Sequence, residues 1–161
     1  MAVSESIEEL LHSGYRYALS LTHNKVCAED ILQDAWLSVL KANGPHTRPY
    51  LYSAIRSRFL NQNKREKLAS VIPMDEMPEL EEPFDDTDIQ YSLDCPILEK
   101  ALSELRDTER EALFLTAIEG YTANEIAIFT QQPRGTVLSH IHRAKQKIRR
   151  FFDANNAEAA P

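Results

Sequence analysis

Apolar residues recur every three or four positions along most of the chain, which is the spacing of one buried face of an α-helix. No stretch shows the every-second-residue alternation that is typical of a half-buried strand. The pattern therefore predicts an all-α protein. In the N-terminal part it marks two helices, the first through Ile7, Leu10, Leu11, Ala18 and Leu21 and the second through Ile31, Ala35, Val39 and Leu40.

A third helix is predicted to begin near Thr47, with Pro49 in its first turn, where the missing N–H of proline costs nothing. Three helices joined by short loops predict a small N-terminal bundle over residues 5–68. The apolar positions of the third helix are Leu51, Ile55 and Phe59. They are followed by the basic run Asn63-Lys64-Arg65.

A change of composition separates this bundle from the rest of the chain. Between Val71 and Glu99 there are ten Asp and Glu residues, no Lys or Arg, and four prolines. Such a segment has too few apolar residues to offset the conformational entropy that is lost when its backbone becomes ordered. It predicts an acidic flexible linker over residues 69–95, either as a solubilising spacer or as an occupant of a positively charged groove.

Apolar residues at helical spacing occur again after the linker. Pro96 is predicted to open a helix that runs through Leu98, Leu102 and Leu105. Two Thr-x-x-Glu patterns then predict capping boxes at the starts of the next two helices. The two patterns are Thr108 with Glu111 and Thr122 with Glu125. Gly120 lies between them and suits the left-handed conformation that often ends a helix.

The last two helices predict a helix-turn-helix unit. A short helix over 122–129, a turn over 130–133 and a long helix over 134–152 complete a second domain at 96–152, with a tail at 153–161. A plain amphipathic hairpin has the same pattern. On the long helix, Val137, Ile141, Ala144 and Ile148 form the inward stripe, whereas Thr136, Ser139, His140, Arg143 and Lys147 form a face suited to base edges and phosphates.

The net charge of −7 hides two basic blocks. Residues 41–70 carry seven cations and one acid, and residues 126–152 carry six cations and no acid. Two separated basic stretches are typical of a protein that contacts a phosphate backbone at two places. Helix faces on which Lys and Arg are simply exposed to solvent give the same charge pattern.

The residue pattern gives little support for a nucleotide-binding, metal-binding or catalytic site. The four glycines form no phosphate-binding loop, and Cys27 and Cys95 have no neighbours at ligand spacing. His140 and His142 point to opposite sides of a helix, so no metal site is expected. We therefore expect no cofactor and no enzyme activity. Neither a signal peptide nor an apolar run of about 18 residues is present, which favours a cytoplasmic protein without membrane insertion.

Two segments of the first half, Tyr15-Arg16-Tyr17-Ala18-Leu19 and Ala28-Glu29-Asp30-Ile31-Leu32-Gln33-Asp34-Ala35-Trp36-Leu37, are similar to region 2 of a known family. That family is the extracytoplasmic-function (ECF) sigma factors of bacterial RNA polymerase, within the sigma-70 family. The resemblance implies that one helix docks on the clamp helices of core polymerase. The residues implied are Asp30, Gln33, Asp34 and Leu37.

The segment from Arg48 to Arg65 resembles the part of region 2 that binds and melts the minus-10 promoter element. Tyr50, Ser57 and Asn61 stand where the family usually has Trp, Asn and Asp, so the base preference is left open. The residues implied in minus-10 binding are Tyr50, Arg56, Ser57, Arg58, Asn61, Lys64 and Arg65.

The second half resembles region 4, which binds the minus-35 element. Its similar segments include Arg110-Glu111-Ala112-Leu113, Glu119-Gly120-Tyr121-Thr122, Glu125-Ile126-Ala127 and Arg143-Ala144-Lys145. The residues implied in minus-35 binding are Arg134, Thr136, Leu138, Ser139, His142, Arg143 and Lys147.

The resemblance implies a bacterial transcription initiation factor whose partners are core RNA polymerase, promoter DNA and an anti-sigma factor that holds the two domains together. Two other functions stay open. One is a helix-turn-helix regulator that binds duplex DNA without polymerase, and the other is a sigma-like decoy that binds only an anti-sigma factor. The two basic blocks argue against the decoy, because a decoy needs no phosphate contacts.

Overall fold

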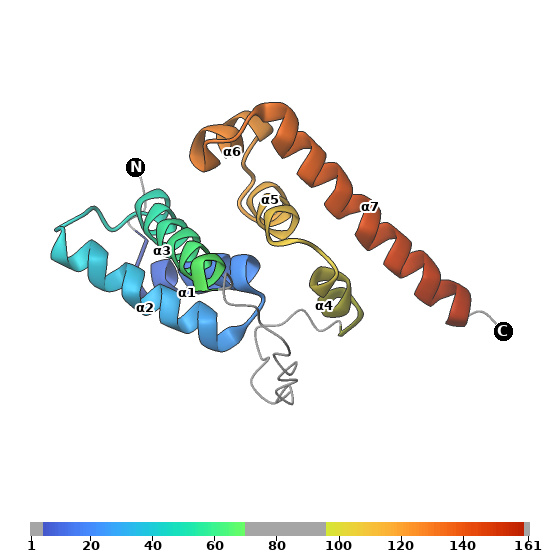
Figure 1. The fold of residues 1–161 in the computed structure, drawn as a ribbon, viewed down its shortest axis with the longest axis horizontal. Coiled ribbons are helices and arrows are strands. Elements are labelled where there is room, and N and C mark those ends of the chain that lie inside the picture. The colour runs from blue at the N-terminus through green and yellow to red at the C-terminus, as the bar shows by residue number, and fades with distance from the viewer. Residues whose placement is uncertain (1–4, 70–95, 160–161) are drawn as a thin grey trace.

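The computed structural model describes residues 5–69 and 96–159, and in these two ranges every regular element is a helix (Figure 1). The all-α prediction is confirmed. The predicted linker lies outside the described residues except for Ala69, which ends the third helix. The helices are α1 (Ile7–Thr22), α2 (Lys25–Lys41), α3 (Arg48–Ala69), α4 (Pro96–Ser103), α5 (Asp107–Ala117), α6 (Ala123–Thr130) and α7 (Arg134–Ala159).

The first three helices pack on one another as the predicted N-terminal bundle. A capping box starts α1, because the Ser6 hydroxyl accepts the Glu9 N–H and the Glu9 carboxylate accepts the Ser6 N–H, each at 3.1 Å. The Asn24 side chain caps α2 by accepting the Cys27 N–H at 3.0 Å. The short α1–α2 connection is held by the Asn24 cap and by the His23 N–H, which donates to the Leu19 carbonyl oxygen.

Two apolar residues that the sequence pattern placed in this core lie on the surface. Ile7 is 52% exposed, because it is the first residue of α1 and extends past the end of the bundle. Leu40 is 45% exposed, because Val39 beside it takes the inward position of the last turn of α2. The other predicted core positions of α1 and α2 are buried or half-buried.

The start of α5 differs from the sequence prediction. Thr108 and Glu111 form no capping box; α5 begins two residues earlier, with Arg106 as its N-cap and the Glu109 carboxylate accepting the Arg106 N–H at 3.3 Å. Glu111 is buried and bonds elsewhere. Only half of the second predicted capping box forms: the Thr122 hydroxyl accepts the Glu125 N–H at 3.2 Å, but the Glu125 carboxylate accepts the Thr122 hydroxyl instead of its backbone N–H.

Helices α6 and α7 form the predicted helix-turn-helix. Gly120 has a φ of +73°, so the turn before α6 uses the left-handed conformation expected of it. The turn between the helices places Gln131 at a φ of +55°, where glycine is the usual choice. Val137 and Ala144 are fully buried, as their stripe predicted. Residues 153–159, expected in a tail, continue α7.

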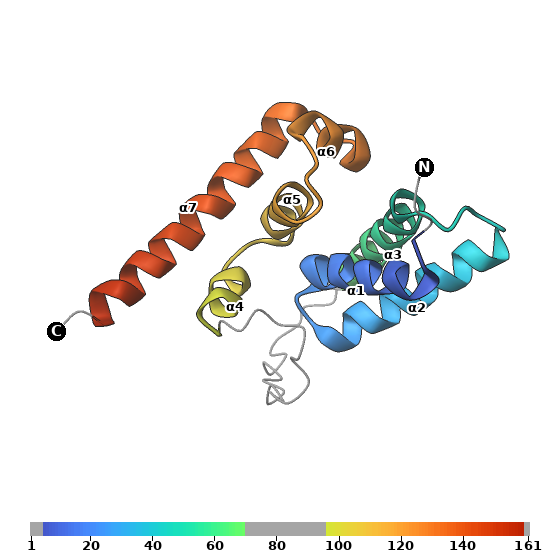
Figure 2. The same ribbon diagram turned by 180° about the vertical axis from the view of Figure 1, so that it is seen from behind.

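The two halves of the chain pack directly against each other. Helix α5 lies between α1 of the bundle and the long α7, and both views show it there (Figures 1 and 2). One continuous apolar core includes Tyr17 and Tyr52 of the bundle together with Leu115, Ile126 and Val137 of the second half. The described residues therefore form two domains with a shared core.

Candidate nucleic-acid and protein interfaces

Helix α2 presents one exposed face and one buried face. Its buried face is made by Ala28, Ile31 and Ala35, each at most 3% exposed. All four residues predicted to bind polymerase lie on the solvent side of the helix. Those residues are Asp30, Gln33, Asp34 and Leu37.

Two further apolar residues, which are not among the predicted polymerase-binding residues, share this exposed face. Val26 is 60% exposed and Leu40 is 45% exposed. Positions 26, 30, 33, 37 and 40 alternate in steps of four and three, which is the spacing of a seam that packs on another helix. The sequence pattern had predicted Leu40 in the core instead, because its apolar spacing fits either face.

Most of the predicted minus-10 residues lie on the outer face of α3. Ser57, Arg58, Asn61, Lys64 and Arg65 are all exposed. Arg58 also donates a hydrogen bond to the Ser38 hydroxyl, which ties the basic face of α3 to α2.

Tyr50 borders a small pocket between α2 and α3. Its ring packs so closely on Gly44 that a Cβ at that position would overlap the ring. The pocket has a volume of about 350 Å³ and opens beside the basic face of α3. Its lining residues are Ser38, Val39, Ala42, Tyr50, Ser53 and Ala54. The pocket therefore combines an aromatic ring with small neighbouring side chains.

Arg56 is the predicted minus-10 residue that does not lie on this outer face. Its side chain is only 15% exposed, and its Nε donates to the Glu111 carboxylate at 2.9 Å. Glu111 belongs to α5, so Arg56 is directed at the C-terminal domain. The structure therefore separates Arg56 from Arg58 and the other cations of α3.

Helix α7 carries the predicted minus-35 face. Arg134, Leu138, Ser139, His142 and Arg143 are exposed, whereas Thr136 is half-buried. The two remaining polar residues of the predicted face are constrained. Lys147 donates to the Glu109 carboxylate at 2.7 Å, and the Nδ1 atom of His140 is buried without a hydrogen-bond partner.

Glu109 and Lys147 connect α5 to α7. Glu109 is almost fully buried, and burial alone raises the pKa of a carboxyl group. Hydrogen bonds from Lys147 and the Arg106 backbone outweigh that burial and hold the pKa of Glu109 below its usual value. The charged pair fixes the direction of the exposed face of α7 relative to α5.

A polar cluster that the sequence pattern did not predict joins the two domains. The Glu111 carboxylate accepts hydrogen bonds from the Tyr17 hydroxyl at 2.7 Å and from Arg56. The Glu119 carboxylate accepts the Tyr52 hydroxyl at 2.8 Å and pairs with Arg48 at 3.2 Å.

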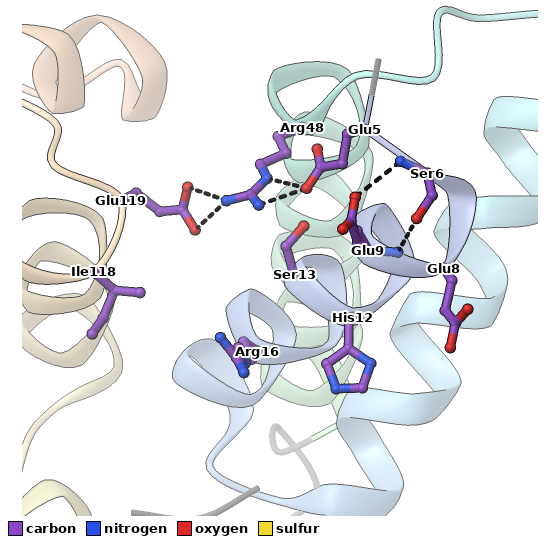
Figure 3. Close-up of a pocket in the computed structure, with 10 residues that line it drawn as sticks. All are labelled: Glu5, Ser6, Glu8, Glu9, His12, Ser13, Arg16, Arg48, Ile118 and Glu119. Carbon is purple, nitrogen blue, oxygen red and sulfur yellow. Dashed lines mark hydrogen bonds and ion pairs between the residues drawn. The ribbon is translucent and has the colours of Figure 1, made fainter. Parts of the chain in front are cut away.

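Figure 3 shows the Arg48 guanidinium between Glu119 of the second domain and Glu5 at the start of the chain. These residues border an open groove of about 930 Å³ between α1 and the α5–α6 turn. Ile118 faces the groove from the second domain and is 63% exposed.

Aromatic rings pack beside the carboxylates. Tyr17 and Tyr52 stack with ring centroids 4.5 Å apart, and Phe114 and Phe129 of the second domain lie 5.9 and 6.2 Å from Tyr17. Burial, and then the charge of Glu111, raise the pKa of Tyr17 well above its ordinary value. Tyr17 is therefore a neutral donor at physiological pH.

Arg110 of α5 caps α1 from the other domain. Its guanidinium is buried and donates to the carbonyl oxygens of Ser20 at 2.7 Å and Leu21 at 3.2 Å. These carbonyls belong to the last turn of α1 and have no partner within the helix. A cation at this end is also favoured by the helix dipole.

No group of three His, Cys, Asp or Glu residues that is placed to hold a metal ion occurs within 5–69 and 96–159. In the same ranges, no helix combines the length and apolarity that a membrane crossing requires.

The fold and its surfaces define a two-domain helical protein whose second domain is a helix-turn-helix with a basic exposed face. The family model for "Sigma-70, region 4" matches residues 96–148. This match covers the second domain, and the chain as a whole is similar to ECF RNA polymerase sigma factors.

Relatives of that group match most of the chain. The ECF RNA polymerase sigma factor SigM of Bacillus subtilis is 24% identical over 95% of this chain and 96% of its own length. The RNA polymerase sigma factor CarQ of Myxococcus xanthus is 29% identical over 87% of this chain and 83% of its own length. The match to SigE of Mycolicibacterium smegmatis is 30% identical and spans 91% of this chain but 60% of that protein.

A solved structure shares the fold. It is the sigma factor RpoE of Bartonella quintana, crystallised in complex with the anti-sigma factor NepR. The likeness has a TM-score of 0.66 at 21% identity, and it covers 89% of this chain and 92% of RpoE. The likeness therefore extends across both domains.

Proposed function

We propose that the chain is a transcription initiation factor that binds core RNA polymerase and directs it to promoters through minus-10 and minus-35 elements. One observation carries the proposal: the exposed face of α2 and two basic helix faces, on α3 and α7, occur in a single chain that is similar to ECF sigma factors. Such a protein acts by binding and performs no reaction of its own. Its place of action is the bacterial cytoplasm, where polymerase and DNA are found.

The exposed face of α2 binds the clamp helices of core polymerase. Leu37, Val26 and Leu40 supply apolar area at helical spacing, and Asp30, Gln33 and Asp34 supply groups that pair with cations and amides on the partner. Interfacial charges of this kind fix the register and the choice of partner more than they add affinity. The mixed apolar and acidic face suits a helical, partly basic surface.

The outer face of α3 holds the unpaired minus-10 strand. Arg58, Lys64 and Arg65 face solvent and are placed to neutralise phosphates. The pocket beside Tyr50 offers an aromatic ring and small apolar side chains to a base that has left the stack. Phosphate contacts then position the strand, and the pocket reads a base.

The exposed face of α7 enters the major groove of the minus-35 duplex. Arg134, Ser139 and Arg143 are free to reach phosphates or base edges, while Val137 and Ala144 anchor the helix to its own domain. Leu138 adds an apolar contact of the kind that reads a thymine methyl group. An anti-sigma factor that covers both domains is the expected inhibitor.

The test is a binding experiment in two steps. A fluorescently labelled chain is titrated with purified bacterial core polymerase, and the resulting complex is then titrated with promoter duplexes. We expect saturable core binding, followed by DNA binding that is tighter than either component achieves alone. Tight, sequence-specific DNA binding without polymerase would replace the proposal with a stand-alone regulator, and core binding without DNA binding would replace it with a decoy.

A further inference from the structure

Lys147 differs from the other cations of the long helix α7. Within residues 5–69 and 96–159 it is the only cation of α7 that forms an ion pair. Its ammonium group donates to the Oε1 atom of Glu109, on α5, at 2.7 Å. The remaining cations of the helix are exposed, and they are Arg134, Arg143, Lys145, Arg149 and Arg150. Lys147 is therefore directed at its own domain, whereas the others face solvent.

Glu109 depends on this pairing because it has lost its water. Its side chain is 2% exposed. Oε1 also accepts the Arg106 N–H at 3.3 Å, whereas Oε2 is buried and has no hydrogen-bond partner in the described part of the chain. Breaking a buried pair by removing one partner leaves an uncompensated charge, which is strongly unfavourable. The carboxylate therefore holds Lys147, and with it α7, at one place on α5.

The pair lies just beyond the end of α7 that faces DNA. Lys147 is one helical turn past Arg143, and the inward residues Val137 and Ala144 are fully buried. Apolar contacts of this kind have no preferred direction. A hydrogen-bonded ion pair does have one, since its strength falls steeply with distance and angle. Of these contacts, the Glu109–Lys147 pair is the one that fixes the angle of α7 against α5.

A small change of this angle moves the DNA-facing end of α7 a long way. Arg134 and Ala144 are separated by about 15 Å along the helix axis, at about 1.5 Å per residue. A tilt of about 4° at Ala144 moves the Arg134 end by about 1 Å over that length. Binding groups must be held within about 0.5 Å of their productive positions. Hydrogen bonds to base edges are therefore lost before the helix leaves the groove.

We propose that Lys147 and Glu109 are positioning residues for minus-35 recognition: Lys147 acts on DNA through Glu109, by fixing the angle of α7, and contacts no phosphate itself. The inference rests on the proposed function. It gives Glu109, a buried residue of α5, a part in sequence discrimination. It also replaces the direct minus-35 contact that the sequence pattern predicts for Lys147.

The test is a double-mutant cycle on the complex of the full chain with core polymerase. K147M removes the charge at similar side-chain length, E109Q keeps an acceptor for the Arg106 N–H, and E109Q/K147M combines them. Discrimination is measured as the ratio of affinities for a promoter duplex and for single-base variants of its minus-35 element. We expect each single variant to lose about tenfold in discrimination, which corresponds to about 1.4 kcal/mol. The double variant should lose no more, because all three variants break the same contact.

Salt dependence separates a positioning role from a phosphate contact. Each phosphate contact contributes about 0.9 to the slope of log affinity against log salt concentration. E109Q/K147M has the net charge of the parent, and we expect it to have the slope of the parent. A slope that is smaller by about 0.9 in both K147M and E109Q/K147M would overturn the proposal, as would losses of discrimination that add in the double variant.

Two matched variants control for charge and for folding. K147R should keep the discrimination of the parent, because a guanidinium can bond to Oε1 and to the unpartnered Oε2 together. K145M removes an exposed cation of the same helix and should also keep it. Circular dichroism checks that every variant is folded. A loss in K147R or K145M as large as that in K147M would overturn the proposal.

The parent complex distinguishes this inference from the proposed function. If the parent complex binds no promoter duplex, the proposed function is refuted and the inference with it. If the parent complex discriminates among duplexes while the losses in the cycle are additive, only the inference is refuted.

Discussion

Arg110 offers a direct measure of how strongly the two domains are coupled. Its guanidinium donates to the carbonyl oxygens of Ser20, Leu21 and Leu105 at 2.7, 3.2 and 3.0 Å, and it pairs with Asp107. Arg110→Ala removes all of these donors and leaves three carbonyls without them. An unsatisfied buried acceptor costs about 1–3 kcal/mol. Because water can reach part of the opened site, we take the lower end and expect a loss of about 3 kcal/mol.

This loss is a large share of the free energy of unfolding of a small protein, which is about 5–15 kcal/mol. The assay is urea unfolding followed by far-UV circular dichroism, which reports all helices, and by fluorescence of Trp36, which reports the N-terminal bundle. In the parent the two signals should change together. In Arg110→Ala they should separate, because the domains no longer unfold as one cooperative unit.

The matched control is Arg16→Ala, which removes an exposed arginine of α1 and should change the free energy of unfolding by less than about 0.5 kcal/mol. The reasoning is refuted if Arg110→Ala costs no more than this control, or if its two unfolding signals still coincide. Either result would show that water replaces the guanidinium without loss.

Three further predictions concern the separate surfaces. Asp34→Arg should abolish core polymerase binding while circular dichroism shows an unchanged fold; unchanged affinity for core would remove α2 from the polymerase interface. Arg143→Ala should weaken binding of the polymerase complex to minus-35 duplexes by about 1–3 kcal/mol and relax the preference at one base pair, as measured across a set of single-base variants; a uniform loss across all variants would instead indicate a phosphate contact. The raised pKa of Tyr17 means that its neutral form stabilises the folded state, fully below the ordinary tyrosine pKa of about 10 and progressively less as the pH rises towards the folded-state value. The free energy of unfolding should therefore fall above about pH 10, and Tyr17→Phe should show a smaller fall; equal slopes for the two proteins would contradict this assignment.

The helices and the helix-turn-helix could be predicted from sequence because their signals are local. Apolar spacing, Pro49, Pro96 and Gly120 each constrain the few residues around them, and a helix occurs at each predicted place, although α5 begins two residues earlier and α7 continues into the predicted tail. The two basic faces followed from the same spacing. The exposed residues of α2 were likewise predictable once the inward stripe of the helix had been identified.

Contacts between the domains could not be predicted in this way. Glu111 matches a capping pattern with Thr108, yet it bonds to Tyr17, which lies 94 positions away in the sequence. Arg56 has the composition of a phosphate contact, and only the packing of α5 against α1 shows that it faces a carboxylate. The local sequence pattern does not show whether a long cationic side chain contacts a phosphate or a carboxylate of its own chain. Leu40 shows the same limit, because a neighbouring valine took the buried place.

The most direct test of the proposed function is run-off transcription from a genomic promoter library with purified bacterial core polymerase, with and without this chain. The proposed function predicts transcripts that depend on the chain and share paired elements at minus-10 and minus-35. Their absence with several compatible core polymerases, under conditions in which a known sigma factor supports transcription, would contradict it.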